Sequence, residues 1–337
     1  MGFPAKLLNT KALLAKLEAT YGTAIAVTST ADGQLLALGD RTQAIVTPNW
    51  AYDGAVGPAP GNLGMLKRVA AVGRSATITV PMRAKGAAAT YAATVLPNIH
   101  TMLKICGMDS TLNSGTYTYT PTPDSITYSS ATMEAYARGQ KWTSRGVIGS
   151  FSIDAPNAGA IPLWTFDCRG ILDTAVADAA IVAPTYPTLT TAEPTATGIT
   201  LSIGSFVAPT VKSWSFKMNR SIENPRLDMT AADIHQGFVP AGYEPEFRVT
   251  VDSTALTYPN STSGFDPYKA RLNGEAFALA LTVGGTALNR WKLNMATAQL
   301  AEFTENGEGP VATTELVFRP YNSTPIVQTD CFTVVFD

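Results

Sequence analysis

The chain has 337 residues, of which 45% are hydrophobic and 15% are charged, and its formal net charge is -2. This hydrophobic content excludes a wholly disordered chain, and the length fits two domains or one large β domain. A nearly neutral chain lacks the positive charge with which nucleic-acid-binding proteins hold phosphates. The low charge favours a surface that neighbouring subunits partly cover.

The first predicted element is an amphipathic helix over residues 10–21, in which Leu13, Leu14 and Leu17 form one apolar stripe. A helix at the start of the chain with few other apolar neighbours must dock on something. It docks either on its own half of the chain or, as an arm, on an adjacent subunit. The sequence leaves both possibilities open.

The first half of the chain then mixes strands with one long loop. Residues 24–48 are predicted to form two short strands, and residues 49–65 are rich in Gly and Pro without any hydrophobic period. An unpatterned loop of this length is usually functional or mobile. Alternating apolar residues at 76–82 predict a strand. A short helix follows, with Pro97 in its first turn and Gly107 at its end.

The clearest pattern in the chain is a predicted β-hairpin at residues 289–321. Its first strand alternates Trp291, Leu293 and Met295 with polar residues, which is the period of a strand with one buried face. The polar, Gly-rich segment 305–310 connects the two strands and is expected to lie outside the sheet, because it ends in a proline.

A weaker copy of this hairpin lies at residues 147–168. Between the copies, residues 183–197 are rich in Pro and Thr and form the best linker in the chain. On each side of it, a strand, a long loop, a strand, a short helix and a hairpin follow in the same order, with residues 219–245 as the second long loop. The sequence therefore predicts two related lobes, residues 1–182 and 198–337.

The cysteines indicate neither a metal site nor a disulfide framework. Cys106, Cys168 and Cys331 are far apart and form no CxxC pair, so we expect small buried hydrophobic residues in a reducing compartment. The sequence shows no hydrophobic signal segment and no apolar run long enough to span a membrane. We expect a protein that folds in the cytoplasm where it is made.

A search for catalytic residues finds few candidates. His100 lies beside an apolar stripe and is predicted to be structural, and His235 lies in the second long loop. No phosphate-binding loop, dinucleotide fingerprint, nucleophile elbow or zinc-protease motif occurs. We predict that Glu302, Glu305 and Glu308 form a solvated hairpin tip, and we expect no catalytic, cofactor or metal site. Four tryptophans at apolar strand positions are core candidates: Trp142, Trp164, Trp214 and Trp291.

Four stretches of the chain carry a family resemblance: LLAKLEATYGT, SATITVPMRA, YARGQKWTSRGVIGSFSIDAPNAGAIPLWTFDCRG and WKLNMATAQLAEFTENGEGPVATTELVFRP. Together they resemble the tail tube (major tail) proteins of long-tailed, siphovirus-like bacteriophages. The resemblance spans about residues 10–320 and rests on the order and texture of strands, with no invariant catalytic residue. The linker and the loop at 219–245 match nothing in that family.

The resemblance implies a mainly β chain with two tandem tail-tube-like β-sandwich or barrel lobes, each with a short flanking α-helix. It implies a structural virion protein, not an enzyme, that is made and assembled in the host bacterial cytoplasm. Rings of six such folds stack into a tube, so two lobes per chain imply a trimer with pseudo-sixfold symmetry. If one lobe is an outward decoration, the ring is a hexamer.

The same resemblance implies partners and residue roles. Other tail proteins are the expected partners, such as the tape measure, terminator and baseplate components, while DNA passes through the lumen without specific binding and nothing inserts into a membrane. The polar faces of the hairpin strands supply the candidates for the lumen: Ser150, Ser152, Asn294 and Thr297. The arm and the two long loops supply the candidate contacts between subunits: Leu13, Leu14, Leu17, Trp50, Tyr52, Asp53, Pro58, Arg226 and Phe238.

Two other classes of protein compete with this interpretation. An outer-membrane β-barrel would have alternating strands and an aromatic residue near the C-terminus, such as Phe336, but it would also need a signal peptide. A secreted carbohydrate-binding or adhesive β-sandwich would need paired carboxylates in a cleft with aromatic platforms, and no such pair stands out.

Overall fold

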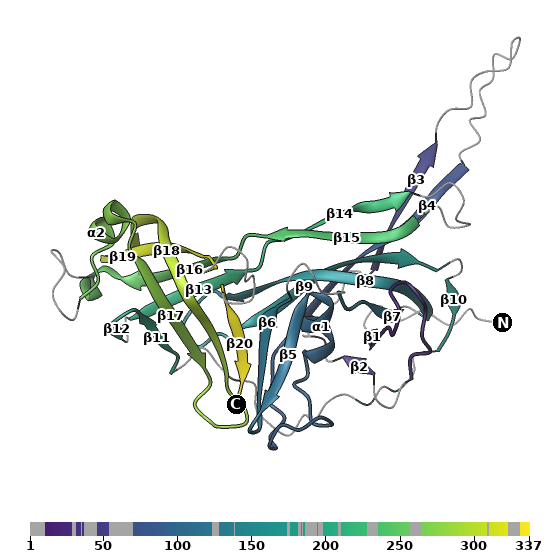
Figure 1. Ribbon diagram of the computed structural model, residues 1–337, viewed down its shortest axis with the longest axis horizontal. Helices are drawn as coiled ribbons and strands as arrows, with labels where there is room; N and C mark the ends of the chain where they lie inside the picture. Colours follow the sequence, from purple (N-terminus) through teal and green to yellow (C-terminus); the bar gives the residue numbers. More distant parts are fainter. Residues whose placement is uncertain are drawn as a thin grey trace, which may run out of the picture.

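A computed structural model describes residues 11–28, 32–34, 36, 46–53, 70–122, 128–137, 139–173, 176–180, 183, 185, 194, 198–207, 210–227, 235–256, 264–308, 310–322 and 331–337. Antiparallel strands dominate these residues, and the two α-helices among them are short (Figure 1). The prediction of a mainly β chain with two short helices is therefore confirmed.

The first half of the chain contributes one α-helix, which lies between its fourth and fifth strands. Its elements are β1 (Lys11–Leu17), β2 (Gly33–Gln34), β3 (Val46–Asp53), β4 (Ala70–Met82), α1 (His100–Ile105), β5 (Met108–Asn113), β6 (Thr116–Pro121), β7 (Ala131–Ala137), β8 (Gln140–Ala155), β9 (Leu163–Leu172) and β10 (Ala177–Asp178).

The second half begins at β11 and also contains one α-helix. Its elements are β11 (Thr200–Ile203), β12 (Phe206–Val207), β13 (Val211–Lys217), β14 (Arg220–Leu227), β15 (His235–Tyr243), β16 (Glu246–Asp252), a 3-10 turn (Ser253–Ala255), α2 (Pro267–Asn273), β17 (Ala276–Val283), β18 (Trp291–Glu308), β19 (Val311–Pro320) and β20 (Thr333–Phe336).

The two halves repeat one arrangement of strands. In the first half, antiparallel neighbours follow the order β1, β7, β8, β9, β4, β3. In the second half the order is β11, β17, β18, β19, β16, β13. The matching strands also occur in the same sequence order, with α1 before β7 and α2 before β17. The strands and the short helix of the predicted repeat are therefore present in both halves.

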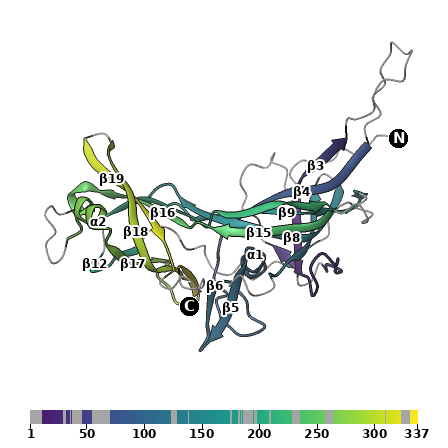
Figure 2. The same ribbon diagram turned by 45° about the horizontal axis from the view of Figure 1, so that its top comes forward.

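The two arrangements join edge to edge within the chain. Near its end, β8 pairs with β13, so that Ile153 is opposite Phe216 and Ala155 is opposite Trp214. As a result, β3, β4, β9, β8, β13, β16, β19 and β18 form one unbroken run of neighbouring strands, called here the long sheet. Figure 2 shows the hairpins at its two ends, β3–β4 and β18–β19, rising on the same side.

One hydrophobic core extends through both halves. Alternate residues of β4, from Ala76 to Met82, are fully buried, as are Trp164 on β9 and Trp291 on β18. All belong to a single cluster of buried side chains that also contains residues of β13, β16 and β20. The predicted linker at 183–197 lies almost entirely outside the described residues, and the domain boundaries stay a prediction.

The predicted N-terminal helix is wrong, because the segment forms β1. Leu13 packs into the main core while Leu14, on the other face of the strand, packs into a second cluster with Tyr136. A strand that is buried on both faces shows a continuous apolar run, which hydrophobic periodicity cannot distinguish from a short helix. Pairing with β7 along the whole of β1 overrides the helix propensity of its Ala, Leu and Lys residues.

The second predicted long loop is largely a hairpin, because residues 220–243 contain β14 and β15. Pro225 lies at an irregularity of the ladder between Glu223 and Arg226, where a residue without an N–H is tolerated. The other predicted loop, 49–65, begins inside β3, and residues 54–65 lie outside the described part.

The predicted turn of the late hairpin is shorter than expected. The ladder between β18 and β19 continues to the pair Glu308 and Val311, so residues 305–308 lie inside it. Earlier in the chain, residues 24–28 form no strand, and β2 is the two-residue strand that follows them among the described residues.

Candidate functional site

The long sheet has one apolar and one polar face. Residues opposite each other in an antiparallel ladder point to the same face, so the alternation of one strand continues across its neighbours. The face opposite the core, called here the polar face, carries mostly hydroxyl and charged side chains. They include Thr77 and Thr79 on β4, Asp167 and Arg169 on β9, Ser150, Ser152 and Asp154 on β8, Ser213, Ser215 and Lys217 on β13, Glu246, Arg248 and Thr250 on β16, and Glu315 on β19.

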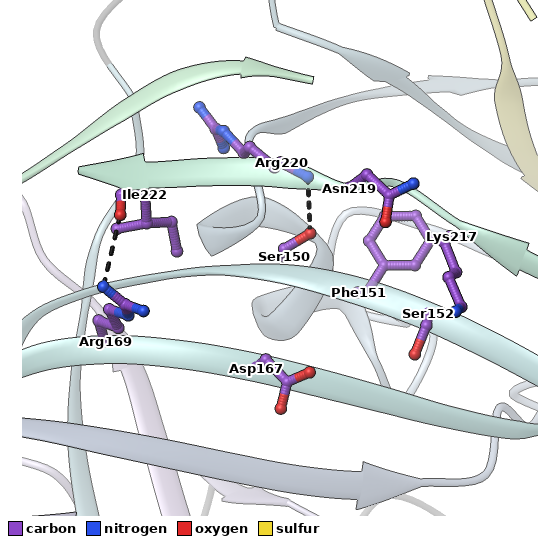
Figure 3. Close-up of a pocket in the computed structure, with 9 residues that line it drawn as sticks. All are labelled: Ser150, Phe151, Ser152, Asp167, Arg169, Lys217, Asn219, Arg220 and Ile222. Atoms are coloured by element: carbon purple, nitrogen blue, oxygen red, sulfur yellow. Dashed lines mark hydrogen bonds between the residues drawn. The ribbon is translucent and has the colours of Figure 1, made fainter. Parts of the chain in front are cut away.

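A groove of about 450 Å³ lies on this face, between strands β8 and β9 and the start of β14 (Figure 3). The groove is lined by the positively charged Arg169 and Lys217 and by the negatively charged Asp167. The Asp167 carboxylate accepts a hydrogen bond of 3.1 Å from the Thr79 hydroxyl. The mixed charge suits a hydrated surface better than a site for one tightly bound anion. The lining residues are Ser150, Phe151, Ser152, Asp167, Arg169, Lys217, Asn219, Arg220 and Ile222.

Arg220 lines the groove through its backbone. Its N–H donates to the Ser150 hydroxyl at 3.1 Å, and Figure 3 shows its side chain directed away from Asp167. The guanidinium group is buried over the ring of Tyr128, with 4.5 Å between its central carbon and the ring centroid. It also fills the space beside Gly107, where an added Cβ would lie 2.0 Å from an Arg220 nitrogen.

The hairpin β14–β15 is fixed to the polar face by apolar and polar contacts. Phe238 packs with Ile148 and Ile171 in a buried cluster of its own. The Tyr21 hydroxyl accepts a hydrogen bond of 2.7 Å from the Phe238 N–H and can donate to the Phe238 carbonyl oxygen at 3.0 Å or to the Gly146 carbonyl oxygen at 3.3 Å. Burial of this hydroxyl raises the pKa of Tyr21. The second half of the chain therefore reaches over the sheet of the first half.

A smaller hollow of about 130 Å³ continues the polar face toward β16 and β19, and Asp154, Ser213 and Ser215 are among its lining residues. Arg248 also lines it and forms ion pairs with Glu246 at 2.6 Å and Glu315 at 3.4 Å. The hydrogen bond that Arg248 donates to Glu246 raises the pKa of Arg248, so the guanidinium keeps its positive charge and the two carboxylates balance it.

The predicted lumen candidates separate into two places. Ser150 and Ser152 line the groove on the polar face. Asn294 and Thr297 lie on the first part of β18, where β17 and β20 are the neighbouring strands, and they do not border that groove. No sequence motif identifies the charged residues Asp167 and Lys217 as part of the groove. Their alternation with buried residues on β9 and β13 nevertheless places them on the same face of the sheet as Ser150 and Ser152.

Several predicted contacts between subunits are contacts within the chain. Leu13 and Leu14 are fully buried, Leu17 packs partly against the core, and Phe238 on β15 is 4% exposed. Leu13, Leu14 and Phe238 therefore leave almost no exposed side chain for another subunit, and the predicted contact of the partly buried Leu17 stays a prediction. Trp50, Tyr52 and Asp53 lie on β3 and Arg226 lies on β14, but their side chains are outside the described part of the structure, as is the whole of Pro58.

His100 has a structural environment. Its Nδ1 lies 2.7 Å from the Tyr119 hydroxyl, and burial, with a smaller contribution from Lys104, lowers the pKa of His100 to about 4. His235 lies on β15, and its side chain is outside the described residues. All three cysteines are buried and free, as predicted.

Among the described residues, no group of three His, Cys, Asp or Glu side chains is arranged to hold a metal ion. The helices within the same ranges are all too short or too polar to cross a bilayer. None of the protein families or curated sequences compared with the chain matches it. The prominent features of the described part are therefore its repeated strand arrangement and the polar face of the long sheet.

Proposed function

We propose that the protein is a structural subunit of a bacteriophage tail tube of the long-tailed, siphovirus type. The repeated strand arrangement carries this proposal, because its second copy is joined edge to edge with the first. A unit that extends a sheet in this way within one chain is suited to extending it between chains. When such head-to-tail contacts close, they form a ring, and stacked rings form a tube.

The repetition favours a ring of three chains. Each chain supplies two copies of the strand arrangement, so three chains supply the six copies that the family resemblance implies. The joint between β8 and β13 makes both copies part of one long sheet, which favours this arrangement over a ring in which one copy is an outward decoration. A hexameric ring stays the alternative.

The polar face is the proposed wall of the DNA channel. Hydroxyl side chains are frequent on it, and Arg248 is neutralised by the carboxylates of Glu246 and Glu315. A wall of unpaired lysine and arginine would attract phosphates strongly and slow the passage of DNA. In the proposed tube, DNA passes without specific binding, and the tape measure, terminator and baseplate components of the tail are the further partners.

Electron microscopy of the purified chain tests this function directly. Stacked hollow rings with threefold end-on averages are the expected result. Sixfold averages would keep the tube and assign one half of the chain to decoration. Light scattering on the same sample gives the mass in solution as a control. Compact particles without a central channel at every protein concentration would contradict the proposal.

A further inference from the structure

The joint between β8 and β13 provides a pattern for a contact between two chains. On one edge, β8 pairs first with β7, up to Val147, and then with β13, from Ser152 to Ala155. Its other edge is paired with β9 as far as Asp154. The end of β8 therefore has neighbours on both sides, and β13 is the neighbour that comes from the second copy.

The corresponding end of β18 has one edge to which no strand of the described residues pairs. On that edge, β18 pairs with β17 up to Gln299. Beyond this point β19 is the only strand that pairs with it within the described part of the chain, as far as Glu308, while α2 packs nearby through Tyr268 and Phe303. A strand edge of this length exposes backbone N–H and C=O groups that can pair with another chain.

The opposite end of the long sheet also ends in a free edge. β3 matches β13 in the repeat, and β4 is its only partner among the described residues. Figure 1 shows β3 and the β18–β19 hairpin at opposite ends of the molecule. Two different edges at opposite ends can pair head to tail with further copies of the chain.

The repeat also gives the register of this contact. Matching Arg169 on β9 with Arg319 on β19 aligns the two copies, because each arginine directly follows a fully buried core residue, Cys168 or Phe318. Across the ladders, Cys168 is opposite Ile78 and, in the second copy, Phe318 is opposite Phe247. Ser152 on β8 then corresponds to Thr304 on β18. Lys217 on β13 corresponds to Thr47 on β3.

We infer that β3 of one chain pairs antiparallel with the end of β18 in the next chain, in the register in which β13 pairs with β8. Because Lys217 is opposite Ser152 within the chain, Thr47 is opposite Thr304 between chains. Both threonines are exposed, as a contact formed only on assembly requires, and paired threonines are favourable across antiparallel strands. This inference rests on the proposed tube function and names the surfaces that close its ring.

Cysteine cross-linking tests the register. Chains with Thr47→Cys are mixed with chains of different length that carry Thr304→Cys, and the mixture is oxidised under conditions of assembly. Because the three native cysteines are buried, they should not compete. A disulfide-linked pair of one long and one short chain is the expected product, since directly opposite residues on neighbouring strands come within disulfide distance.

Two matched variants control this experiment. Ser152→Cys with Lys217→Cys in one chain should form an internal disulfide and shows that the register permits the bond. Thr77→Cys replaces Thr47→Cys in the second control. Thr77 lies on β4, opposite Thr47 of β3. It would therefore be one strand too far from Thr304 and should give little cross-link.

The outcomes separate the inferred contact from the proposed function. Rings or tubes in the microscope without the cross-linked pair would overturn the contact and leave the tube intact. Equal cross-linking from Thr77→Cys would overturn the register. If neither assemblies nor cross-links form while the internal control disulfide is present, both the contact and the tube are overturned.

Discussion

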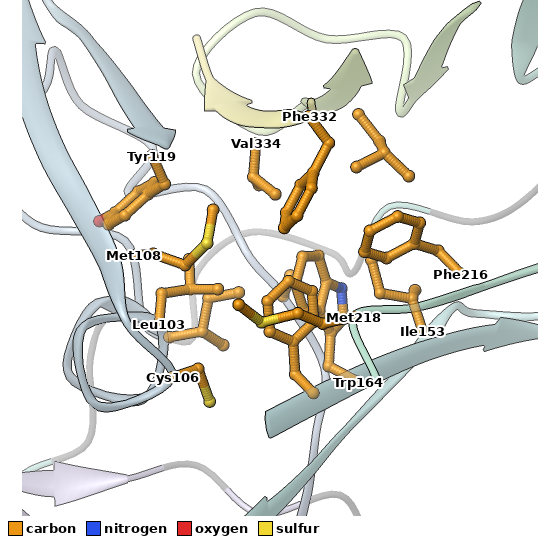
Figure 4. Close-up of a cluster of buried hydrophobic side chains, with 14 of the residues drawn as sticks. Leu103, Cys106, Met108, Tyr119, Ile153, Trp164, Phe216, Met218, Phe332 and Val334 are labelled. Atoms are coloured by element: carbon orange, nitrogen blue, oxygen red, sulfur yellow. The ribbon is translucent and has the colours of Figure 1, made fainter. Parts of the chain in front are cut away.

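Trp164 on β9 and Trp291 on β18 meet edge to face, with 5.1 Å between ring centroids and 71° between ring planes. Trp291 also lies 5.9 Å from the ring of Trp214. Trp164 belongs to the first half of the chain and Trp214 and Trp291 belong to the second, and all three pack in one core. Figure 4 shows the neighbouring region of this core, where Ile153 of the first half packs near Phe216 of the second.

Replacing Trp291 with Ala should therefore destabilise both halves together. The loss of a fully buried aromatic side chain costs about 3 to 5 kcal/mol of unfolding free energy. Denaturant unfolding followed by fluorescence and circular dichroism should show one earlier transition. Trp142→Ala, at a partly buried position, is the control and should cost less. Two separated transitions in the Trp291 variant would mean that the halves unfold independently.

Removing the Tyr21 hydroxyl should loosen the β14–β15 hairpin while leaving the global fold intact. In Tyr21→Phe the Phe238 N–H loses its acceptor, which costs about 1 to 2 kcal/mol locally. Hydrogen exchange at Phe238 should become about tenfold faster, and the melting temperature should change little. Tyr268→Phe on α2 is the control. Unchanged exchange at Phe238 would show that apolar packing alone holds the hairpin.

The sequence predicts an element well where one face is buried and local signals agree. Trp291, Leu293 and Met295 alternate with polar residues, and all three are buried on β18. The helix α2 begins where the Asp266 carboxylate accepts from the Lys269 N–H and ends at Gly274 in a left-handed conformation. In these segments, period, cap and turn residues indicate the same structure.

Prediction fails where tertiary contacts decide. β1 has helix-forming residues, and only its pairing with β7 and burial on both faces make it a strand. The hairpin β14–β15 contains Pro225 and Pro240, which indicate a loop when strand partners are unknown. The groove on the polar face unites Asp167 with Lys217, and their proximity follows from the β8–β13 pairing, which no local pattern contains.

Glu18 joins three segments of the first half through four hydrogen bonds. Its carboxylate accepts from the backbone N–H groups of Gly22 at 2.8 Å and Gly146 at 2.9 Å. It also accepts from the hydroxyls of Ser130 at 2.6 Å and Thr132 at 2.8 Å. Both oxygens are used twice, so an amide group of the same shape cannot replace the carboxylate.

Glu18→Gln should therefore lower the unfolding free energy by about 2 to 3 kcal/mol, because the new NH₂ group faces two donors and leaves them without an acceptor. Urea unfolding at neutral pH measures this loss. Glu305→Gln, at an exposed position of β18, is the control and should be nearly neutral. Equal stability of the two variants would mean that water replaces the missing acceptor.

The buried environment of His100 predicts a pH dependence of stability. Burial and Lys104 lower the pKa of His100 to about 4 from an ordinary value of 6.5. Between these values the unfolded chain binds a proton that the native state does not, so stability falls as the pH decreases through this window and then levels off. The lowered pKa corresponds to a loss of at most about 3 kcal/mol, reduced by solvent screening of this half-buried group.

The variant His100→Gln isolates this contribution, because Gln retains a hydrogen-bonding group for the Tyr119 hydroxyl but does not titrate. Carboxylates such as Asp337, whose pKa is lowered by the hydrogen bond from Arg290, also become protonated at low pH, and this destabilises both proteins alike. The difference in unfolding free energy between the two chains should therefore shift in favour of the variant from pH 7 to pH 4. Parallel pH profiles would show that His100 is protonated in the native state as readily as in the unfolded chain.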